Sequence, residues 1–178
     1  MLSRDQIVQA FTRLGEILWR QKKRGEIAVF GGTAIVLEHD FRNATKDVDA
    51  KITGEHGAVI EAQRQVAAEL GLPAYWLNEQ ATVYLSSKAD FALFGAYPDE
   101  LHPGLLVHVA TPEYLLAMKA QSQRIDDIRD AVLLARSTGL TTAEQITNLV
   151  GRFYPGEQIT ERLRVHIQEL VRQVNASD

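Results

Sequence analysis

Two aspartates, Asp47 and Asp49, alternate with apolar residues in the stretch 47–52, which is typical of a β-strand. Because successive side chains of a strand point to opposite faces, both carboxylates are expected on one face, together with Lys51. They would lie about 6–7 Å apart and repel each other unless water or a cation lies between them. A hard divalent ion such as Mg²⁺ prefers one or two carboxylates together with substrate phosphates. The pair is therefore a candidate Mg²⁺ site, and the alternative is a solvated polar face of a sheet.

A Gly31-Gly32 pair precedes the aspartates, between a strand-like run at 27–30 and a short helical stretch at 33–39. Glycine lets the backbone approach a ligand without a Cβ atom, and a helix that starts here presents free N–H groups to an anion. Taken with the two aspartates, this arrangement predicts a place for a metal-chelated triphosphate. For the glycines alone, a plain tight turn is the alternative. The segment lacks the Gly-Lys-Ser/Thr of a P-loop, and a Rossmann fingerprint is also absent.

The elements around these motifs predict an α+β fold. Before residue 111 the apolar spacing indicates two further helices and three further strands, which are the helices 4–23 and 57–70 and the strands 82–87, 90–95 and 105–110. From Pro112 onward the spacing is helical throughout. We therefore predict a small mixed sheet with flanking helices, divided into a core at 1–111 and a C-terminal helical part at 112–178 that packs on it.

The composition is that of a chain able to bury a core, with 178 residues of which 46% are hydrophobic and 24% charged. It contains no cysteine, which excludes disulfides, thiolate zinc sites and cysteine nucleophiles. The N-terminal stretch is amphipathic, and no apolar run reaches the ~18 residues that span a bilayer, so we expect a cytoplasmic protein with no membrane partner. The formal net charge of −4 argues against broad nonspecific nucleic-acid binding, although RQKKR at 20–24 is a local basic run, ordinarily explained as a solvated helix end.

The order of these motifs resembles the nucleotidyltransferase superfamily, in which a Gly-Gly or Gly-Ser turn precedes an Asp-x-Asp strand. The closer resemblance is to the AbiEii-like branch and to a bacterial group of nucleotidyltransferase-like proteins. The matching motifs lie between residues 26 and 135 and are FGGTA at 30–34, Arg42, Thr45, Asp47 and Asp49, WLN at 76–78, EYLLAMK at 113–119, and Arg124, Asp127 and Asp130.

The resemblance implies Mg²⁺-dependent transfer of a nucleoside monophosphate from an NTP to a hydroxyl of a tRNA or a protein. It also implies a toxin of a toxin–antitoxin pair, with a cognate antitoxin as partner. The implied catalytic residues are Asp47, Asp49 and Lys119, of which the aspartates hold one or two metal ions. The implied nucleotide-binding residues are Gly31, Gly32, Thr33, Arg42, Lys119 and Asp127. Such a transfer needs positioning and charge neutralisation more than covalent catalysis, which metal ions held by carboxylates supply.

The superfamily usually has a third acidic residue on a later strand, and this sequence departs from that pattern. The stretch 105–110 offers His108 and no carboxylate, and Glu79 and Asp90 are the nearest acidic candidates. A catalytically inactive module that binds NTP or RNA is therefore the alternative function.

Several of these residues also have a structural explanation. Lys119 and the charged residues after it could form ordinary intrahelical ion pairs, worth a few tenths of a kcal/mol each. Arg42 could be a surface loop charge instead of a clamp for the acidic strand or the NTP. Trp76 and Asn78 could line a base or acceptor pocket, although an aromatic residue after a Pro-containing turn is more often buried in the core.

Overall fold

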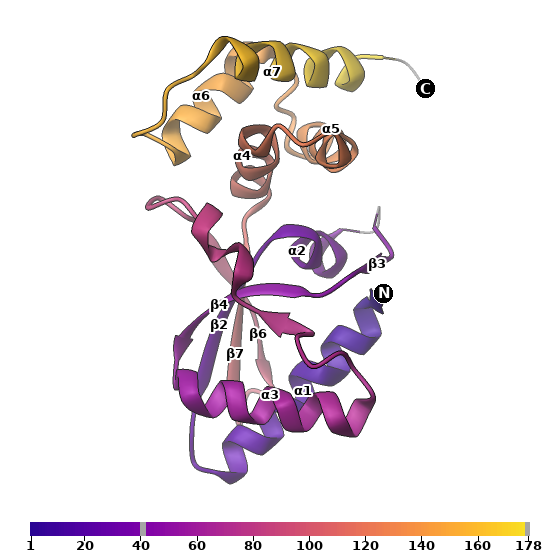
Figure 1. The fold of residues 1–178 in the computed structure, drawn as a ribbon, viewed down its shortest axis with the longest axis vertical. Helices are drawn as coiled ribbons and strands as arrows, with labels where there is room; N and C mark the ends of the chain where they lie inside the picture. The colour runs from indigo at the N-terminus through magenta and orange to yellow at the C-terminus, as the bar shows by residue number, and fades with distance from the viewer. Residues whose placement is uncertain (40–41, 177–178) are drawn as a thin grey trace. The chain divides into compact units, whose positions relative to one another are not determined.

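The computed structural model describes residues 1–39 and 42–176. The chain divides into two compact units. Unit 1 comprises Met1–Val83 and Phe91–Ala110, and unit 2 comprises Tyr84–Asp90 and Thr111–Asp178. All strands of the described residues belong to unit 1, and the last four α-helices belong to unit 2 (Figure 1). Residues 84–90, which the sequence analysis kept with the first part of the chain, group with unit 2.

The strands of unit 1 form two sheets. Within the described residues they are β1 (Leu2–Ser3), β2 (Gly25–Val29), β3 (Ala44–Thr45), β4 (Val48–Gly54), β5 (Leu77–Asn78), β6 (Phe91–Tyr97) and β7 (Leu105–Ala110). The larger sheet has the order β5-β4-β2-β7-β6, and β1 pairs with β3. Strand β2 lies antiparallel to β4 and parallel to β7. The predicted α+β class with a small mixed sheet is therefore confirmed.

One face of the larger sheet is apolar and is packed against two helices, α1 (Arg4–Arg20) and α3 (His56–Leu70). In β4, Val48, Ala50 and Ile52 are buried, whereas Asp49 is half-buried and Lys51 is exposed. This alternation is the one that the sequence predicts, and it assigns Asp49 to the face opposite the apolar core.

Helix α1 approaches the sheet closely because it carries a glycine at the crossing point. A Cβ atom on Gly15 would lie 2.3 Å from the carbonyl oxygen of Tyr97, and one on Gly104 would lie 2.0 Å from the carbonyl oxygen of Gly15. The helix ends at Arg20 instead of at the predicted residue 23, because Lys22 already adopts the left-handed backbone region with a φ of 55°.

The predicted strand at 82–87 is wrong, because the chain forms a 3₁₀-helix, η1 (Gln80–Tyr84), and no strand before β6 in this stretch. Its backbone groups form hydrogen bonds with side chains of unit 2 instead of with a neighbouring strand. The N–H of Ser86 donates to the hydroxyl of Tyr114 at 2.9 Å, and the carbonyl of Tyr84 accepts from the hydroxyl of Tyr154 at 3.3 Å. Tertiary hydrogen bonds thus override a local preference for strand.

Unit 2 is helical, as predicted from Pro112 onward. Its elements are α4 (Pro112–Ser122), η2 (Ile125–Asp127), α5 (Ile128–Thr138), α6 (Ala143–Phe153) and α7 (Glu161–Val174). The hydroxyls of Thr142 and Thr160 accept hydrogen bonds from the first turns of α6 and α7 and cap them. The core of the unit includes the rings of Tyr114 and Phe153, whose centroids lie 5.0 Å apart.

Across the described residues, every helix is too short or too polar to cross a bilayer.

Candidate functional site

The glycine turn lies at a strand–helix junction, as predicted. Strand β2 ends at Val29, and helix α2 (Gly31–Glu38) begins two residues later. Gly31 has a φ of +65°, a conformation that favours glycine. A Cβ atom at this position would lie 3.2 Å from Oδ2 of Asp49. The glycine turn and the carboxylate of Asp49 are therefore neighbours, although Gly31 and Asp49 are 18 positions apart in the sequence.

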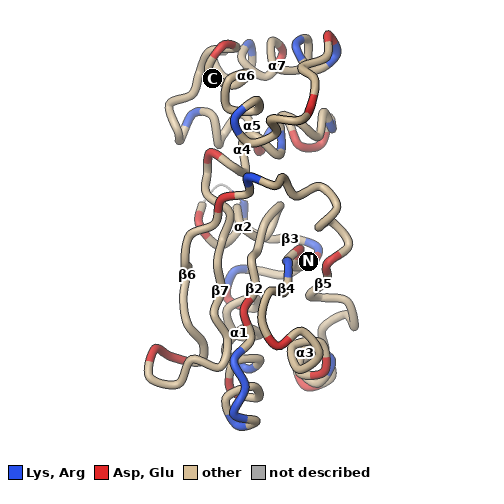
Figure 2. Tube along the Cα trace, turned by 90° about the vertical axis from the view of Figure 1, so that its left-hand side faces the viewer, with Lys and Arg blue, Asp and Glu red and all other residues tan. Residues whose placement is uncertain are grey.

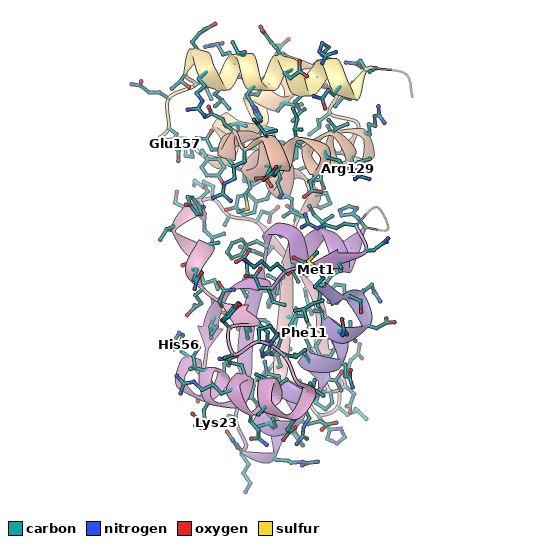
Figure 3. All side chains as sticks on the ribbon, turned by 45° about the vertical axis from the view of Figure 1, so that its right-hand side comes forward. Met1, Phe11, Lys23, His56, Arg129 and Glu157 are labelled. Atoms are coloured by element: carbon teal, nitrogen blue, oxygen red, sulfur yellow. The ribbon has the colours of Figure 1, made fainter. Side chains whose placement is uncertain are left out.

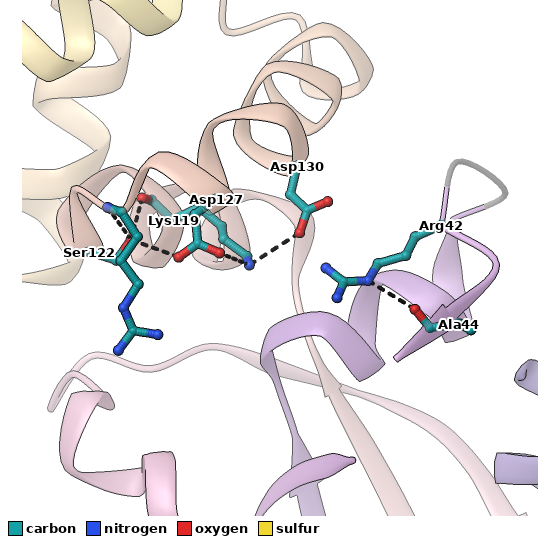
Figure 4. Close-up of polar contacts among 7 residues, drawn as sticks. Arg42, Ala44, Lys119, Ser122, Asp127 and Asp130 are labelled. Atoms are coloured by element: carbon teal, nitrogen blue, oxygen red, sulfur yellow. Dashed lines mark hydrogen bonds and ion pairs between the residues drawn. The ribbon is translucent and has the colours of Figure 1, made fainter. Parts of the chain in front are cut away.

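The N-terminus of α2 has two features that favour an anion. Its N-cap residue, Phe30, provides no side-chain hydrogen bond to the first turn, which leaves backbone N–H groups available. The guanidinium of Arg42 lies against the next glycine, since a Cβ atom on Gly32 would lie 3.0 Å from its Cζ and Nη2 atoms. The Nε of Arg42 donates to the carbonyl of Ala44 at 3.2 Å (Figure 4). Arg42 therefore adds positive charge at the start of the helix.

Only one of the two aspartates lies within the strand. Asp49 belongs to β4, whereas Asp47 lies in a bend before it, which corrects the prediction that both belong to the strand. Within this bend, the carbonyl of Asp47 accepts a hydrogen bond from the hydroxyl of Thr33 at 2.7 Å. The pairing of the strand then starts at Val48, whose N–H donates to the carbonyl of Trp76.

Thr33, expected among the phosphate ligands, is 1% exposed. Its hydroxyl is used in the hydrogen bond to Asp47. The side chain of Thr33 therefore ties the first turn of α2 to the aspartate segment, and the phosphate-binding capacity of this turn lies in its backbone N–H groups.

Asn78 lies beside the aspartate segment and binds Asp47. In the parallel register of β4 and β5 it lies opposite Asp49, and its Nδ2 donates to Oδ2 of Asp47 at 3.3 Å. The neighbouring Trp76 is fully buried, and its indole N–H donates to the carbonyl of Gln63 at 3.1 Å. Trp76 is thus a core residue and not part of a base pocket. The supporting role of Asn78 was missed, although the WLN motif pointed to this segment.

The side chains considered for the third acidic position have other contacts. Glu79 accepts a hydrogen bond from the N–H of Ile52 at 2.9 Å and lies 2.7 Å from Nε2 of His56. Burial raises the pKa of Glu79, but these two contacts outweigh it, so the pKa lies below its ordinary value. Asp90 accepts from the hydroxyl of Thr111 at 3.1 Å.

His108 on β7 lies 3.4 Å from a carboxylate oxygen of Glu26, on the neighbouring strand β2. Since His108, Glu79 and Asp90 have these other partners, the pair Asp47 and Asp49 is the principal acidic feature near Gly31.

The described residues contain no group of three or more histidine, cysteine, aspartate or glutamate side chains that could hold a metal ion. Asp47 and Asp49 offer carboxylate oxygens, which suit a hard cation such as Mg²⁺. Mg²⁺ commonly takes one or two protein carboxylates and completes its shell with water and substrate phosphates. The donor set therefore fits a Mg²⁺ ion that arrives with a triphosphate.

A second polar cluster lies in unit 2, around Lys119 (Figure 4). Its ammonium forms an ion pair with Asp127 and lies 3.2 Å from Oδ2 of Asp130. The hydroxyl of Ser122 lies 2.9 Å from the carbonyl oxygen of Lys119 and 2.9 Å from Oδ2 of Asp127. Ser122 was not singled out in the sequence, because a serine at a helix end carries no distinctive signal.

These ion pairs join different elements, so the explanation as intrahelical pairs is wrong. Helix α4 ends at Ser122 because Gln123 adopts the left-handed region with a φ of 52°. Asp127 and Asp130 follow on η2 and α5. The side chains of Lys119 and Asp130 are 11% and 12% exposed, so the charges are largely removed from water. Breaking one partner of such a cluster is costly, because it leaves an uncompensated buried charge.

A comparison of the chain with protein-family models, with curated proteins and with solved structures found no match.

Proposed function

We propose that the protein is a Mg²⁺-dependent nucleotidyltransferase that moves a nucleoside monophosphate from an NTP to a hydroxyl of a tRNA or protein acceptor. The observation that carries the proposal is the contact of the Asp49 carboxylate with Gly31, at the start of a helix whose first turn has no side-chain cap. A carboxylate suited to binding a cation thus lies beside backbone N–H groups suited to binding phosphates.

Different residues of unit 1 would bind the phosphates and the metal ion. The first turn of α2, with the guanidinium of Arg42 beside Gly32, binds and orients the negatively charged phosphates. Asp47 and Asp49 would hold Mg²⁺, and Asn78 and Thr33 keep the Asp47 segment in place. An ion held by these two carboxylates would supply neutralisation of charge on the phosphates and on the leaving pyrophosphate.

In the proposed reaction, the acceptor oxygen forms a bond to the α-phosphorus. The bond between the α-phosphorus and the oxygen that bridges to the β-phosphate breaks, and pyrophosphate leaves. The proton of the acceptor hydroxyl passes to solvent. The protein supplies alignment and electrostatic stabilisation, and no covalent intermediate is required.

Lys119 and Asp127 enter the proposal through the resemblance, which implies that they contact the nucleotide. The role in a toxin–antitoxin pair and the cognate antitoxin rest on the same resemblance. A cytoplasmic location is part of the proposal for the same class of protein.

One observation favours a second function, an inactive module that binds NTP or RNA. Glu79, a candidate for the third carboxylate, is hydrogen-bonded to Ile52 and His56. With two carboxylates alone, the site could bind a metal–nucleotide complex without activating an acceptor hydroxyl.

Incubation with each of the four NTPs, labelled at the α-phosphate, with Mg²⁺ and with either total tRNA or protein as acceptor, separates the two functions. We expect Mg²⁺-dependent labelling of one acceptor class by the wild-type chain and none by Asp49→Asn. Nucleotide binding without labelling would support the inactive module, and equal labelling by both proteins would overturn the proposed site.

A further inference from the structure

We propose that the surface hollow around Trp19, at the C-terminal end of α1, binds single-stranded nucleic acid through base stacking and phosphate contacts. The hollow measures ≈ 590 Å³ and is lined by Trp19, Arg20, Lys22, Lys23, Arg24 and Pro103. It lies at the start of β2, whereas the glycine turn follows the end of that strand, so the two sites occupy opposite ends of unit 1.

The indole of Trp19 is exposed and offers a surface for stacking. Trp19 is 44% exposed, and the ring of His102 packs nearly perpendicular to the indole, with ring centroids 5.3 Å apart and planes 78° apart. The Nδ1 of His102 lies 2.9 Å from a carboxylate oxygen of Asp99, which holds the imidazole in place. An exposed tryptophan is suited to stacking against a nucleobase, since every base has a π-face.

Most of the positively charged side chains around Trp19 form no ion pair with another described residue. Arg20 is close enough to Glu69 to lower the pKa of that carboxyl, after the larger effects of Arg13 and Gln65. Lys22, Lys23 and Arg24 are exposed, and none of them forms an ion pair with any residue for which the structure gives a position. Figure 2 shows this basic run at the end of α1, and Figure 3 labels Lys23 there. Neighbouring like charges repel each other, and an anionic chain would relieve that repulsion.

The usual preference for positive charge at the C-terminal end of a helix explains only part of this basic run. A cation in the last turn of α1 stabilises the helix dipole, and Arg20 occupies that place. Lys22 instead occupies a left-handed position, where glycine is the usual residue. Its backbone therefore gives no reason for a lysine. The part of the net charge of −4 that lies farther away than about 8 Å is largely screened at physiological salt, so the local basic run acts mainly on its own surroundings.

The test follows the emission of Trp19 during titration with single-stranded RNA or DNA oligomers of about 12 nucleotides, within the range of known site sizes. The chain has two tryptophans, and Trp76 is fully buried, so a change on binding reports on Trp19. The titration contains EDTA and no NTP, which makes it independent of nucleotide transfer. Quenching by either oligomer supports the proposal and identifies which nucleic acid binds, and no response to either overturns it.

Paired variants then locate the binding, with anisotropy of a labelled oligomer as the measurement. Lys22→Gln with Lys23→Gln is expected to weaken binding and to lower the slope of log affinity against log salt by about 1.4. Trp19→Ala is expected to weaken binding about 5- to 150-fold. The control, Arg162→Gln with Arg164→Gln, removes the same charge from exposed positions on α7 and should leave binding unchanged. Equal losses in the two double variants, or equal binding of a duplex, would overturn the proposal.

Discussion

The aspartates of the two polar clusters, one in each unit, have different surroundings. In unit 2, Asp127 and Asp130 share the ammonium of Lys119, and all three side chains are largely buried. In unit 1, the carboxylate of Asp47 is half-buried and receives a hydrogen bond from the neutral amide of Asn78. A lysine compensates negative charge, whereas an amide orients a carboxylate and leaves its charge in place.

From this difference we expect the cluster in unit 2 to contribute to stability and the one in unit 1 to ligand binding. The Lys119 cluster holds α4 to the start of α5, so its loss should affect folding first. Asp47 of unit 1 is oriented by a neutral amide, which leaves its charge to attract a cation, so its loss should affect ligand binding first.

The largest effect on stability is expected from Lys119→Met, which leaves Asp127 and Asp130 without the ammonium. We expect a loss of about 3–5 kcal/mol in the free energy of unfolding, measured by urea denaturation at neutral pH. The control is Arg129→Met, which removes one exposed positive charge from α5 and should stay within about 0.5 kcal/mol of wild type. Equal stability of Lys119→Met and wild type would show that the cluster is not a structural one.

A smaller effect is expected from Gly31→Ala, since an L-residue in the left-handed region costs about 1–2 kcal/mol. Gly139→Ala is the matched control, because Gly139 has a φ of +72° and its Cβ atom would meet nothing within 4 Å. Both variants should lose similar stability in urea denaturation. Only Gly31→Ala should also weaken Mg²⁺-dependent NTP binding, since the new methyl group would press on Asp49. Equal NTP affinity in the two variants would separate Gly31 from the site.

The smallest effect concerns Glu79→Gln, which keeps an acceptor for Ile52 and removes the charge. We expect a stability loss below about 1 kcal/mol at neutral pH, since the side chain is 31% exposed. Because the pKa of Glu79 is lowered in the fold, its contribution is present above the unfolded-state pKa of about 4.3 and is lost as pH falls through the folded-state pKa. Denaturation curves at several pH values would show the two proteins converge in acid. A difference that persists there would contradict an electrostatic role.

Local patterns predicted much of unit 1. The alternation in 47–52 assigned Val48 and Ala50 to the core, and the Gly31-Gly32 pair predicted the strand–helix junction. The contact of Gly31 with Asp49 follows from the antiparallel pairing of β2 and β4, which no local pattern specifies.

Contacts between distant residues determine the features that local patterns did not predict. The stretch 82–87 has strand-forming residues, but Tyr114 and Tyr154 bind its backbone. The burial of Lys119 depends on a left-handed Gln123 that redirects the chain, and glutamine gives no sign of this. The buried place of Trp76 follows the expectation for an aromatic residue after a turn.

The central claim is that Asp47 and Asp49 receive Mg²⁺ together with a nucleotide. Thermal unfolding of wild type, Asp49→Asn and Asp126→Asn, each with NTP alone and with NTP plus Mg²⁺, tests it most directly. Asp126 is an exposed acid of unit 2 and serves as the charge control. We predict that Mg²⁺ adds to the rise in Tm in wild type and Asp126→Asn and adds nothing in Asp49→Asn, whose fold should remain within about 1 kcal/mol of wild type. A Mg²⁺-dependent rise of equal size in all three proteins would contradict the account and leave the two aspartates as a polar face of the sheet.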